Sequence, residues 1–316
     1  MKLSSSTGDF GEYIDLVDER VRCFKETKFK YINLEQSGDT AELISDNNDD
    51  WKLFAEKCAN AADYAGISYV ISHAPCLHKP VISALDDKND ETYQRKIKIL
   101  KRSIEVCHAL SIPRIVIHAC ADSSLTQDTF YKYNTMFYRD LFDIAEKYDI
   151  TILTENWDND ASMFSTGKQM RDFIDSVDHP LLAGCWDTAH GNLAKNARTI
   201  GQYQNIIVLG DKLKGLHISD NFGDVHHHSW PFAGIISFDQ VMQALCDVNY
   251  DGYFNFEASY TLLHHRNLPY HRKPWIHNGE TITTLLDPSI ELKKKAVDLL
   301  YDIGQYILET YNCFEI

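Results

Sequence analysis

The stretch LAGCWDTAHGNL, residues 182–193, decides the fold that this sequence predicts. Its apolar run ends abruptly at Asp187, and His190 and a glycine follow within four residues. A buried strand that passes into a helix at this point would bring an anionic oxygen donor and a neutral nitrogen donor to one cavity at its carboxyl end. We expect the chain to repeat this arrangement around a single barrel.

On both sides of this stretch, short apolar runs rich in β-branched residues alternate with longer segments of helical period. The predicted strands are residues 1–6, 31–35, 69–73, 114–118, 151–155, 181–187, 215–219 and 253–257. The predicted helices are residues 12–28, 50–64, 91–110, 130–147, 167–177, 199–209, 238–248 and 288–311, the last with Asp287 as its N-cap and Pro288 in its first turn. Strand–helix units joined by right-handed crossovers predict an α/β fold, a (β/α)8 TIM barrel in which residues 1–316 form one domain.

Two features bear on this prediction. A doubly wound open sheet is the alternative, but it usually has a glycine-rich phosphate loop after its first strand, and SSSTG at residues 4–8 is too weak a match. A long loop, residues 259–287, follows the eighth predicted strand and carries a basic cluster: His264, His265, Arg266, His271, Arg272 and Lys273. Loops of this length in compact domains are usually functional, so we expect a lid or a subunit contact.

The composition is that of a soluble globular protein with a large core. Of the 316 residues, 44% are hydrophobic and 12% are aromatic. No window approaches the roughly 18 apolar residues of a membrane span, and the N-terminal MKLSSSTGDF lacks the build of a signal peptide. The eight cysteines include no Cys-x-x-Cys pair, which favours core thiols in a reducing compartment. We therefore expect a cytoplasmic protein without a membrane partner.

The charge balance bears on the class of partner. The formal charge is -15, from 31 Lys and Arg against 46 Asp and Glu. A protein that binds nucleic acid needs a basic surface that displaces counterions from the phosphates. The composition therefore argues against a nucleic-acid partner.

Side chains that bind metals or protons stand at the carboxyl end of every predicted strand from the third onward. They are His73, His118, Glu155, Asp187, His217 and Glu257. Barrel active sites form at this face, and three carboxylates that converge there without a cation would repel one another. The most economical solution is one divalent metal held by the last four of these residues. Three hard oxygen donors and one imidazole suit Mn(II), Co(II), Mg(II) or Zn(II).

The ordered motifs NLE, SHAP, VIHA, TEN, DTAHGN, HISDN, PFAGIISF and FEAS make the chain resemble a known family. It is similar to the xylose-isomerase-like TIM barrels, a superfamily of sugar and sugar-phosphate isomerases and epimerases that also contains endonuclease IV. The resemblance is strongest from residue 71 to residue 259. It implies that Glu155, Asp187, His217 and Glu257 bind one divalent metal and that His190 contacts a substrate hydroxyl. We add His73, His118 and Trp157 as further candidates for substrate binding.

The endonuclease branch of the superfamily implies more ligands. Its trinuclear zinc site recruits the histidines that match His73, His118 and His190, together with an Asp-x-His pair after the seventh strand. In this chain Asp224 and His226 match the Asp-x-His sequence. Alignment on the downstream PFAG motif instead matches the pair to His226 and His228, and in that alignment a histidine replaces the aspartate. Asp224, His226 and His228 are therefore candidates for extra metal or substrate ligands, and a solvated loop is the equal alternative.

The resemblance favours a divalent-metal-dependent sugar isomerase or epimerase. Its reaction would pass through a metal-stabilised enediolate, with Glu155 and Glu257 as the paired acid and base. An apurinic endonuclease-like zinc phosphodiesterase and an inosose-type dehydratase are the alternatives. The chain has no glycine-rich phosphate cradle, which favours an unphosphorylated sugar or polyol as the substrate. The resemblance also implies a homodimer or a homotetramer.

Overall fold

The protein is described from a computed structural model that covers residues 1–36, 42–43, 45, 47, 49–76, 90–120, 125–264, 275–282, 284–285 and 287–316. Within these ranges, eight parallel strands form one sheet: β1 (Leu3–Ser6), β2 (Tyr31–Glu35), β3 (Ser68–His73), β4 (Arg114–Val116), β5 (Thr151–Glu155), β6 (Leu182–Asp187), β7 (Leu213–His217) and β8 (Phe254–Asn255). Their order is β7-β6-β5-β4-β3-β2-β1-β8, and a bridge between Ile218 and Phe256 joins its two ends. The predicted (β/α)8 barrel is confirmed.

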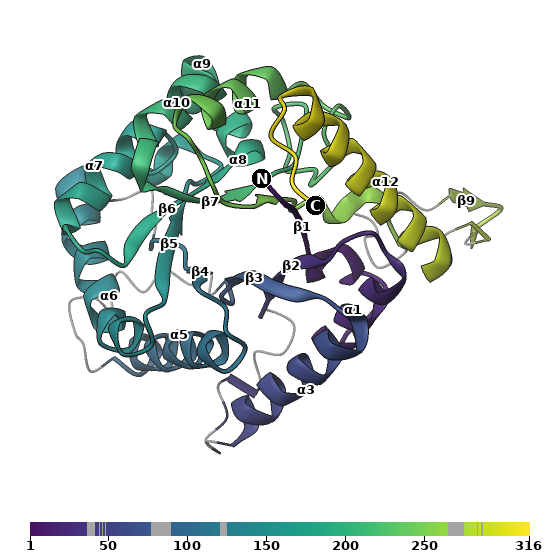
Figure 1. Ribbon diagram of the computed structural model, residues 1–316, viewed down its shortest axis with the longest axis horizontal. Helices are drawn as coiled ribbons and strands as arrows, with labels where there is room; N and C mark the ends of the chain where they lie inside the picture. The colour runs from purple at the N-terminus through teal and green to yellow at the C-terminus, as the bar shows by residue number, and fades with distance from the viewer. Residues whose placement is uncertain are drawn as a thin grey trace.

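Helices surround the strands on all sides (Figure 1). Those that the structure describes are α1 (Val17–Cys23), α3 (Asp50–Ala65), α5 (Glu91–Ala109), α6 (Gln127–Tyr148), α7 (Gly167–Val177), α8 (Thr188–Leu193), α9 (Lys195–Ile200), α10 (Gln202–Leu209), α11 (Phe238–Asp247) and α12 (Ile290–Thr310). Short 3-10 turns are η1 (Thr7–Phe10), η2 (Phe24–Glu26), η3 (Asp160–Ser162), η4 (Gly210–Lys212) and η5 (Ser259–Thr261).

Several predicted boundaries were wrong, for local reasons. The helix expected over residues 199–209 is divided, because Gly201 has φ of +88° and separates α9 from α10. The helix expected over 12–28 is only α1, followed by the tighter turn η2. The last helix begins at Ile290 rather than Pro288, because the Ser289 hydroxyl, and not Asp287, accepts the N–H of Leu292 as its N-cap.

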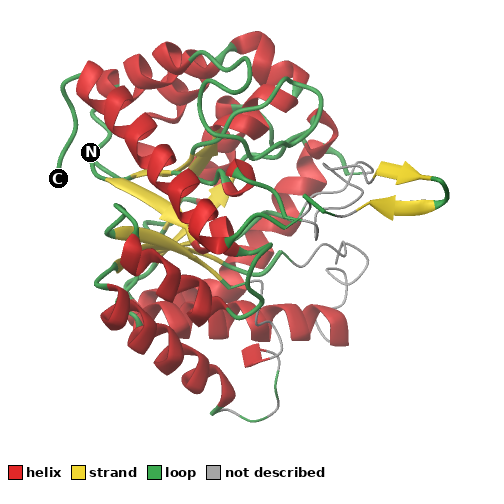
Figure 2. Cartoon of the chain, turned by 90° about the vertical axis from the view of Figure 1, so that its right-hand side faces the viewer, coloured by secondary structure: helices red, strands yellow, loops and turns green. Residues whose placement is uncertain are grey.

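The segment expected to be one long loop after β8 contains regular structure. Strands β9 (Trp275–His277) and β10 (Glu280–Ile282) pair as an antiparallel hairpin. Its turn is Asn278-Gly279, both with positive φ, which is the pair that a two-residue hairpin turn favours. The hairpin projects from the molecule on the side away from the two termini (Figure 2). The predicted basic cluster lies outside the described part of the chain, except for His264. Its members His265, Arg266, His271, Arg272 and Lys273 fall within positions 265–274.

Two apolar layers result from the alternation of side chains along the strands. One face of the strands packs against the helices, and the other fills the barrel interior. The interior layer consists of Val70, Ile71, Val116, Leu153, Ala183 and Cys185. On β5 and β6 the residues two positions further on, Glu155 and Asp187, face the same interior at its upper end, which places polar groups directly above an apolar floor.

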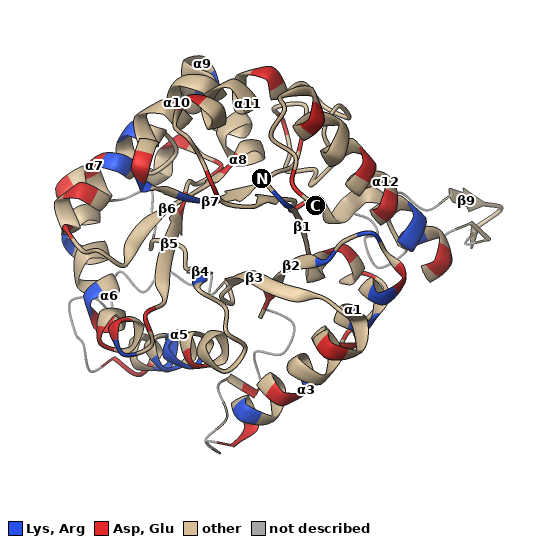
Figure 3. Ribbon diagram, viewed as in Figure 1, with Lys and Arg blue, Asp and Glu red and all other residues tan. Residues whose placement is uncertain are grey.

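The expectation that the cysteines lie in the core holds for Cys58, Cys107, Cys120 and Cys185, whereas Cys76 and Cys246 are exposed. Acidic side chains lie on outer helices around the whole ring (Figure 3). All eight cysteines lie within the described residues and are free thiols. Among the described helices, none is long and apolar enough to cross a membrane.

Candidate metal centre

Four side chains from four consecutive strands converge at the carboxyl end of the barrel. Glu155 ends β5, Asp187 ends β6, His217 ends β7 and Glu257 follows β8. One ligand atom from each lies within 4.8 Å of every other. His217 is central, because its Nδ1 lies 2.9 Å from Glu155 Oε1 and 3.0 Å from Glu257 Oε2. Glu155, Asp187 and His217 are fully buried, and the Glu257 side chain is 16% exposed.

Asp187 is held by the elements on both sides of it. Asn156, directly after β5, accepts the Asp187 N–H at 2.7 Å and donates to the Asp187 carbonyl at 3.0 Å. Asp187 is also the N-cap of α8, since its Oδ1 accepts the N–H of His190 at 2.8 Å. The strand-to-helix turn of the opening motif therefore uses one carboxylate oxygen for the cap, and the other oxygen is buried without a hydrogen-bond partner.

The residues fit a divalent cation. Glu155 Oε2 and Asp187 Oδ2 are buried and have no hydrogen-bond partner, a costly state for a carboxylate oxygen unless a cation lies against it. Burial raises the pKa of Asp187 to about 6. Burial would also raise the pKa of Glu155, but the imidazoles of His217 and His118 hold that pKa well below its usual range. The site thus has an ionised carboxylate at neutral pH and a donor set of three carboxylates and one imidazole, which suits a hard or borderline metal.

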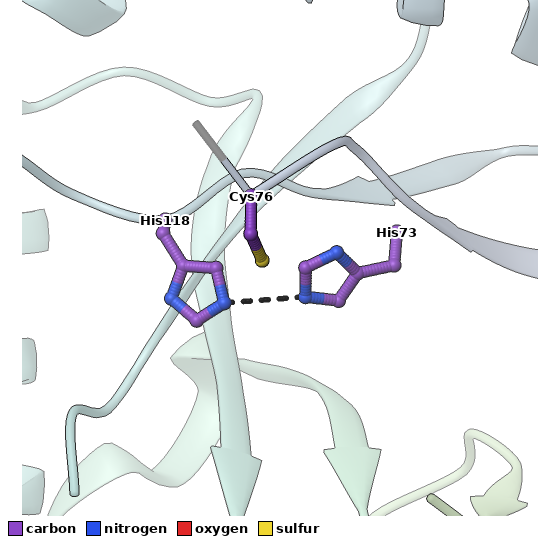
Figure 4. Close-up of side chains that lie close together, drawn as sticks. All are labelled: His73, Cys76 and His118. Carbon is purple, nitrogen blue, oxygen red and sulfur yellow. Dashed lines mark hydrogen bonds between the residues drawn. The ribbon is translucent and has the colours of Figure 1, made fainter. Parts of the chain in front are cut away.

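A second group of donors lies beside Glu155. The Nε2 atoms of His73 and His118 are 3.2 Å apart and lie 3.6 and 3.4 Å from Glu155 Oε2. His73 Nδ1 donates to the carbonyl of Ala74 at 2.7 Å, so that its Nε2 carries the lone pair. The Cys76 thiol lies with the two imidazoles, as Figure 4 shows. Sequence reasoning missed Cys76, although its position three residues after His73 in SHAPC was a signal that could have found it.

A third group of donors lies on the other side of Asp187. His190 Nδ1 donates to the Asn156 carbonyl at 2.8 Å, and its ring contacts that of His226 at 4.6 Å between centroids. Asp187, His190 and His226 bring donor atoms within 4.8 Å of one another. His228 stacks on His226 at 3.7 Å.

The structure places the pair His226 and His228 differently from the pair Asp224 and His226 that the alternative alignment predicts. His226 and His228 lie at the site, whereas the Asp224 side chain is 65% exposed and lies 3.7 Å from His227. The structure therefore does not bring Asp224 to the other donors. Asp220 holds the loop in this position, because its carboxylate accepts the N–H groups of Asn221, Gly234 and Ile236.

The two tryptophans beside the ligands have different neighbours. The Trp157 ring contacts the His118 ring at 4.9 Å between centroids, and its Nε1 is buried without a hydrogen-bond partner. Trp186 is fully buried in the outer apolar layer and donates to Gln202 at 2.8 Å. Of these two tryptophans, Trp157 is the one that contacts a histidine of the site.

The chain is similar to known proteins over most of its length. The model of the family described as xylose isomerase-like TIM barrel matches residues 23–279. The protein y4fM of Sinorhizobium fredii is 26% identical over 186 residues, which are 54% of this chain and 55% of that protein. A probable endonuclease 4 of Nitrosopumilus maritimus is 26% identical over 172 residues, 49% of this chain and 60% of that protein. The chain thus aligns with little more than half the length of these curated relatives.

Solved structures share the fold at lower identity. The D-allulose 3-epimerase from Methylomonas sp. has a TM-score of 0.69 and 17% identity, with 96% of this chain and 98% of that chain covered. The IOLI protein with a bound zinc atom has a TM-score of 0.66 and 17% identity, with 98% and 99% covered. At these identities the likeness concerns the fold.

Proposed function

The chain belongs to the xylose isomerase-like TIM barrel family, and on that premise we propose that it is a divalent-metal-dependent isomerase or epimerase of a small unphosphorylated sugar or polyol. The observation that carries the proposal is the convergence of Glu155, Asp187, His217 and Glu257, with donor atoms within 4.8 Å of one another. Two of their buried carboxylate oxygens have no hydrogen-bond partner. The fold of the Methylomonas D-allulose 3-epimerase and of the zinc-bound IOLI protein lends further support.

The proposed ligands are these four residues. When bound, the metal supplies Lewis acidity that makes a hydrogen next to a substrate carbonyl more acidic and stabilises the negative charge that develops on its oxygen. Mn(II), Co(II), Mg(II) and Zn(II) all suit the donor set.

The two glutamates are suited to move the proton. Glu155 and Glu257 approach His217 Nδ1 from different strands, at 2.9 and 3.0 Å. His217 lowers the pKa of both carboxyls against the effect of burial, so both are ionised and each is able to accept a proton. We assign removal of the proton to one glutamate, which becomes protonated. The other glutamate takes up a proton from solvent and delivers that proton to the opposite side of the substrate carbon. His190, His73 and His118 lie within 3.6 Å of Glu155, and Trp157 contacts His118; we assign these four residues to substrate binding.

Exchange of a substrate hydrogen with solvent tests this function. The metal-loaded protein is incubated with a panel of ketoses in deuterated water, and deuterium next to the carbonyl is followed by NMR. We expect incorporation with the wild type and a loss of at least about 100-fold with Glu257→Gln, which removes the base but keeps the shape. The control is Asp224→Asn, whose exposed side chain lies apart from the donors. Near-normal exchange by Glu257→Gln would contradict the proposal.

A zinc phosphodiesterase is the second candidate, because two further donor groups flank the four ligands. These are His73, Cys76 and His118 on one side and Asp187, His190 and His226 on the other. Such a site would hold more than one ion. In phosphodiesterases with two or more metal ions, the ions stabilise the attacking oxygen and the leaving oxygen of the phosphate ester. Metal content per chain and cleavage of an abasic-site oligonucleotide decide between the candidates. One ion with deuterium exchange supports the isomerase, and three ions with cleavage and no exchange support the phosphodiesterase.

A further inference from the structure

A buried lysine lies outside the proposed ligand set, near the start of α12. Lys293 is 1% exposed, whereas Lys295 on the same helix is exposed. Burying an ammonium group costs free energy unless every proton has a partner and a negative charge is near. The contacts of Lys293 therefore indicate what it holds.

The Lys293 ammonium binds turn η5, which directly follows the proposed ligand Glu257. Its Nζ donates to the Ser259 carbonyl at 2.7 Å and to the Thr261 hydroxyl at 2.7 Å. It also lies 5.9 Å from the centre of the Tyr13 ring, and the Tyr13 hydroxyl donates to the Leu262 carbonyl at 3.0 Å. Lys293 of helix α12 and Tyr13, which lies three residues after η1, thus hold this turn and the residue after it through polar contacts.

Turn η5 in turn holds two residues of the candidate metal centre. The Tyr260 N–H donates to the His228 carbonyl at 3.1 Å, and the His228 ring donates from Nδ1 to the Glu257 carbonyl at 3.1 Å. His228 has φ of +41°, an uncommon conformation for histidine that its surroundings must maintain. A continuous path of hydrogen bonds therefore runs from Lys293 through η5 to His228 and Glu257.

The charge of Lys293 is balanced over a longer distance. Burial lowers the pKa of Lys293 from 10.5 to about 8. The carboxylates of Asp9 and Glu12 oppose this shift. Asp9 is itself buried, and its Oδ2 accepts the Ser5 hydroxyl. The hydrogen bonds of Lys293 and its charge balance thus involve different groups, so that they are separable by mutation.

We propose that Lys293 is a positioning residue, which holds Glu257 and His228 in place at the metal centre through its two hydrogen bonds to η5; the inference rests on the function proposed above. The lysine touches neither the metal nor the substrate. Glu257 lies two residues after the end of β8, where its N–H donates to the Ile218 carbonyl at 3.1 Å, and the contacts of η5 and His228 act on the carbonyl side of Glu257.

Metal affinity and amide exchange together test this role. Mn²⁺ is titrated into the metal-free full chain by calorimetry for the wild type, Lys293→Met, Asp9→Asn and Lys295→Met. We expect the Mn²⁺ dissociation constant to rise about tenfold in Lys293→Met, in the range seen when partners of metal ligands are lost. Asp9→Asn, which keeps the two hydrogen bonds, and Lys295→Met should stay within about twofold of the wild type.

Hydrogen exchange supplies a readout that needs no metal. The amide of Tyr260 should exchange about tenfold faster in Lys293→Met, because the loss of the two contacts to η5 frees the turn. If Lys293→Met does not fold, the double variant Asp9→Asn/Lys293→Met, which removes both buried charges, replaces it. A folded variant with wild-type affinity and wild-type exchange would overturn the inference. Absence of Mn²⁺ binding by the wild type would instead count against the proposed function, and the exchange rate would then decide the role of Lys293.

Discussion

The two oxygens of the Asp187 carboxylate have different tasks. Oδ1 caps α8 through the N–H of His190, and Oδ2 is buried without a hydrogen-bond partner. An N-cap oxygen contributes about 1 kcal/mol, whereas an unpaired buried charge costs more than that. The residue is therefore better explained by a ligand for the free oxygen than by capping alone.

Asp9 is a buried carboxylate outside the metal centre. The free-energy cost of burying its charge can be measured from the pH dependence of stability. Burial raises its pKa from 3.8 to about 6, against the opposing effects of Lys293 and Ser5. Because the folded protein binds this proton more tightly than the unfolded chain, the stability that Asp9 contributes is present below about pH 4 and is lost as the pH rises through about 6. A shift of about two units corresponds to about 3 kcal/mol.

We therefore predict a pH-dependent effect of Asp9→Asn. The free energy of unfolding of the wild type minus that of the variant should fall by about 3 kcal/mol from about pH 4 to about pH 7. Urea denaturation at a series of pH values measures both proteins. Asp15→Asn, at an exposed carboxylate of the same segment, is the control for the loss of one negative charge. A flat difference for Asp9→Asn would show that Asp9 titrates as it does in the unfolded chain.

At the scale of elements, the approach of α7 to α10 depends on one glycine. A Cβ on Gly167 would lie less than 3.0 Å from the backbone of Asn205, while the Gly167 N–H donates to Asn205 Oδ1 at 2.9 Å. Backbone atoms yield less readily than flexible side chains. The two helices are therefore packed at a distance that no larger residue permits.

Gly167→Ala should lower the free energy of unfolding by about 2 kcal/mol or more, because the helices must separate or tilt. Lys168→Ala, at the next and exposed position of α7, should change it by less than about 0.5 kcal/mol. Urea denaturation of the metal-free proteins measures both. Equal stability of Gly167→Ala and the wild type would mean that the two helices separate without cost.

The helices and strands also show how far local patterns predict structure. Strands β2 and β5 have the predicted bounds, and the central residues of both strands are buried. The β9–β10 hairpin was not predicted, although Asn278-Gly279 is a strong turn signal, because its strands are short and carry exposed apolar residues such as Trp275. Period-2 alternation over three residues is too short to distinguish from a loop.

For the whole molecule, the charge of -15 sets the class of ligand that approaches it. Asp and Glu residues occur on helices around the ring (Figure 3), and the net negative charge of the chain opposes the approach of a polyanion. A neutral sugar carries no such penalty.

We predict that the metal-loaded protein binds duplex DNA with a dissociation constant weaker than about 100 µM at low salt, which is outside the range of non-specific DNA-binding proteins. Fluorescence anisotropy of a labelled abasic-site duplex measures this, with an unmodified duplex as the control. Micromolar binding that weakens as salt is added would favour the phosphodiesterase over the isomerase.

The sequence by itself determined the barrel and the chemistry of its rim. Strand and helix periods are local properties, and parallel strands must bring their carboxyl ends together, so Glu155, Asp187, His217 and Glu257 were predictable as neighbours. Only the tertiary structure decided which oxygens lack partners, that His226 and His228 rather than Asp224 reach the site, and that Cys76 lies with His73 and His118. All three features depend on the paths of the loops. Those paths are held by contacts between residues that are apart in sequence, such as the contact of Asp220 with the loop after β7 and that of Lys293 with the loop after β8. No periodicity in the chain encodes such contacts.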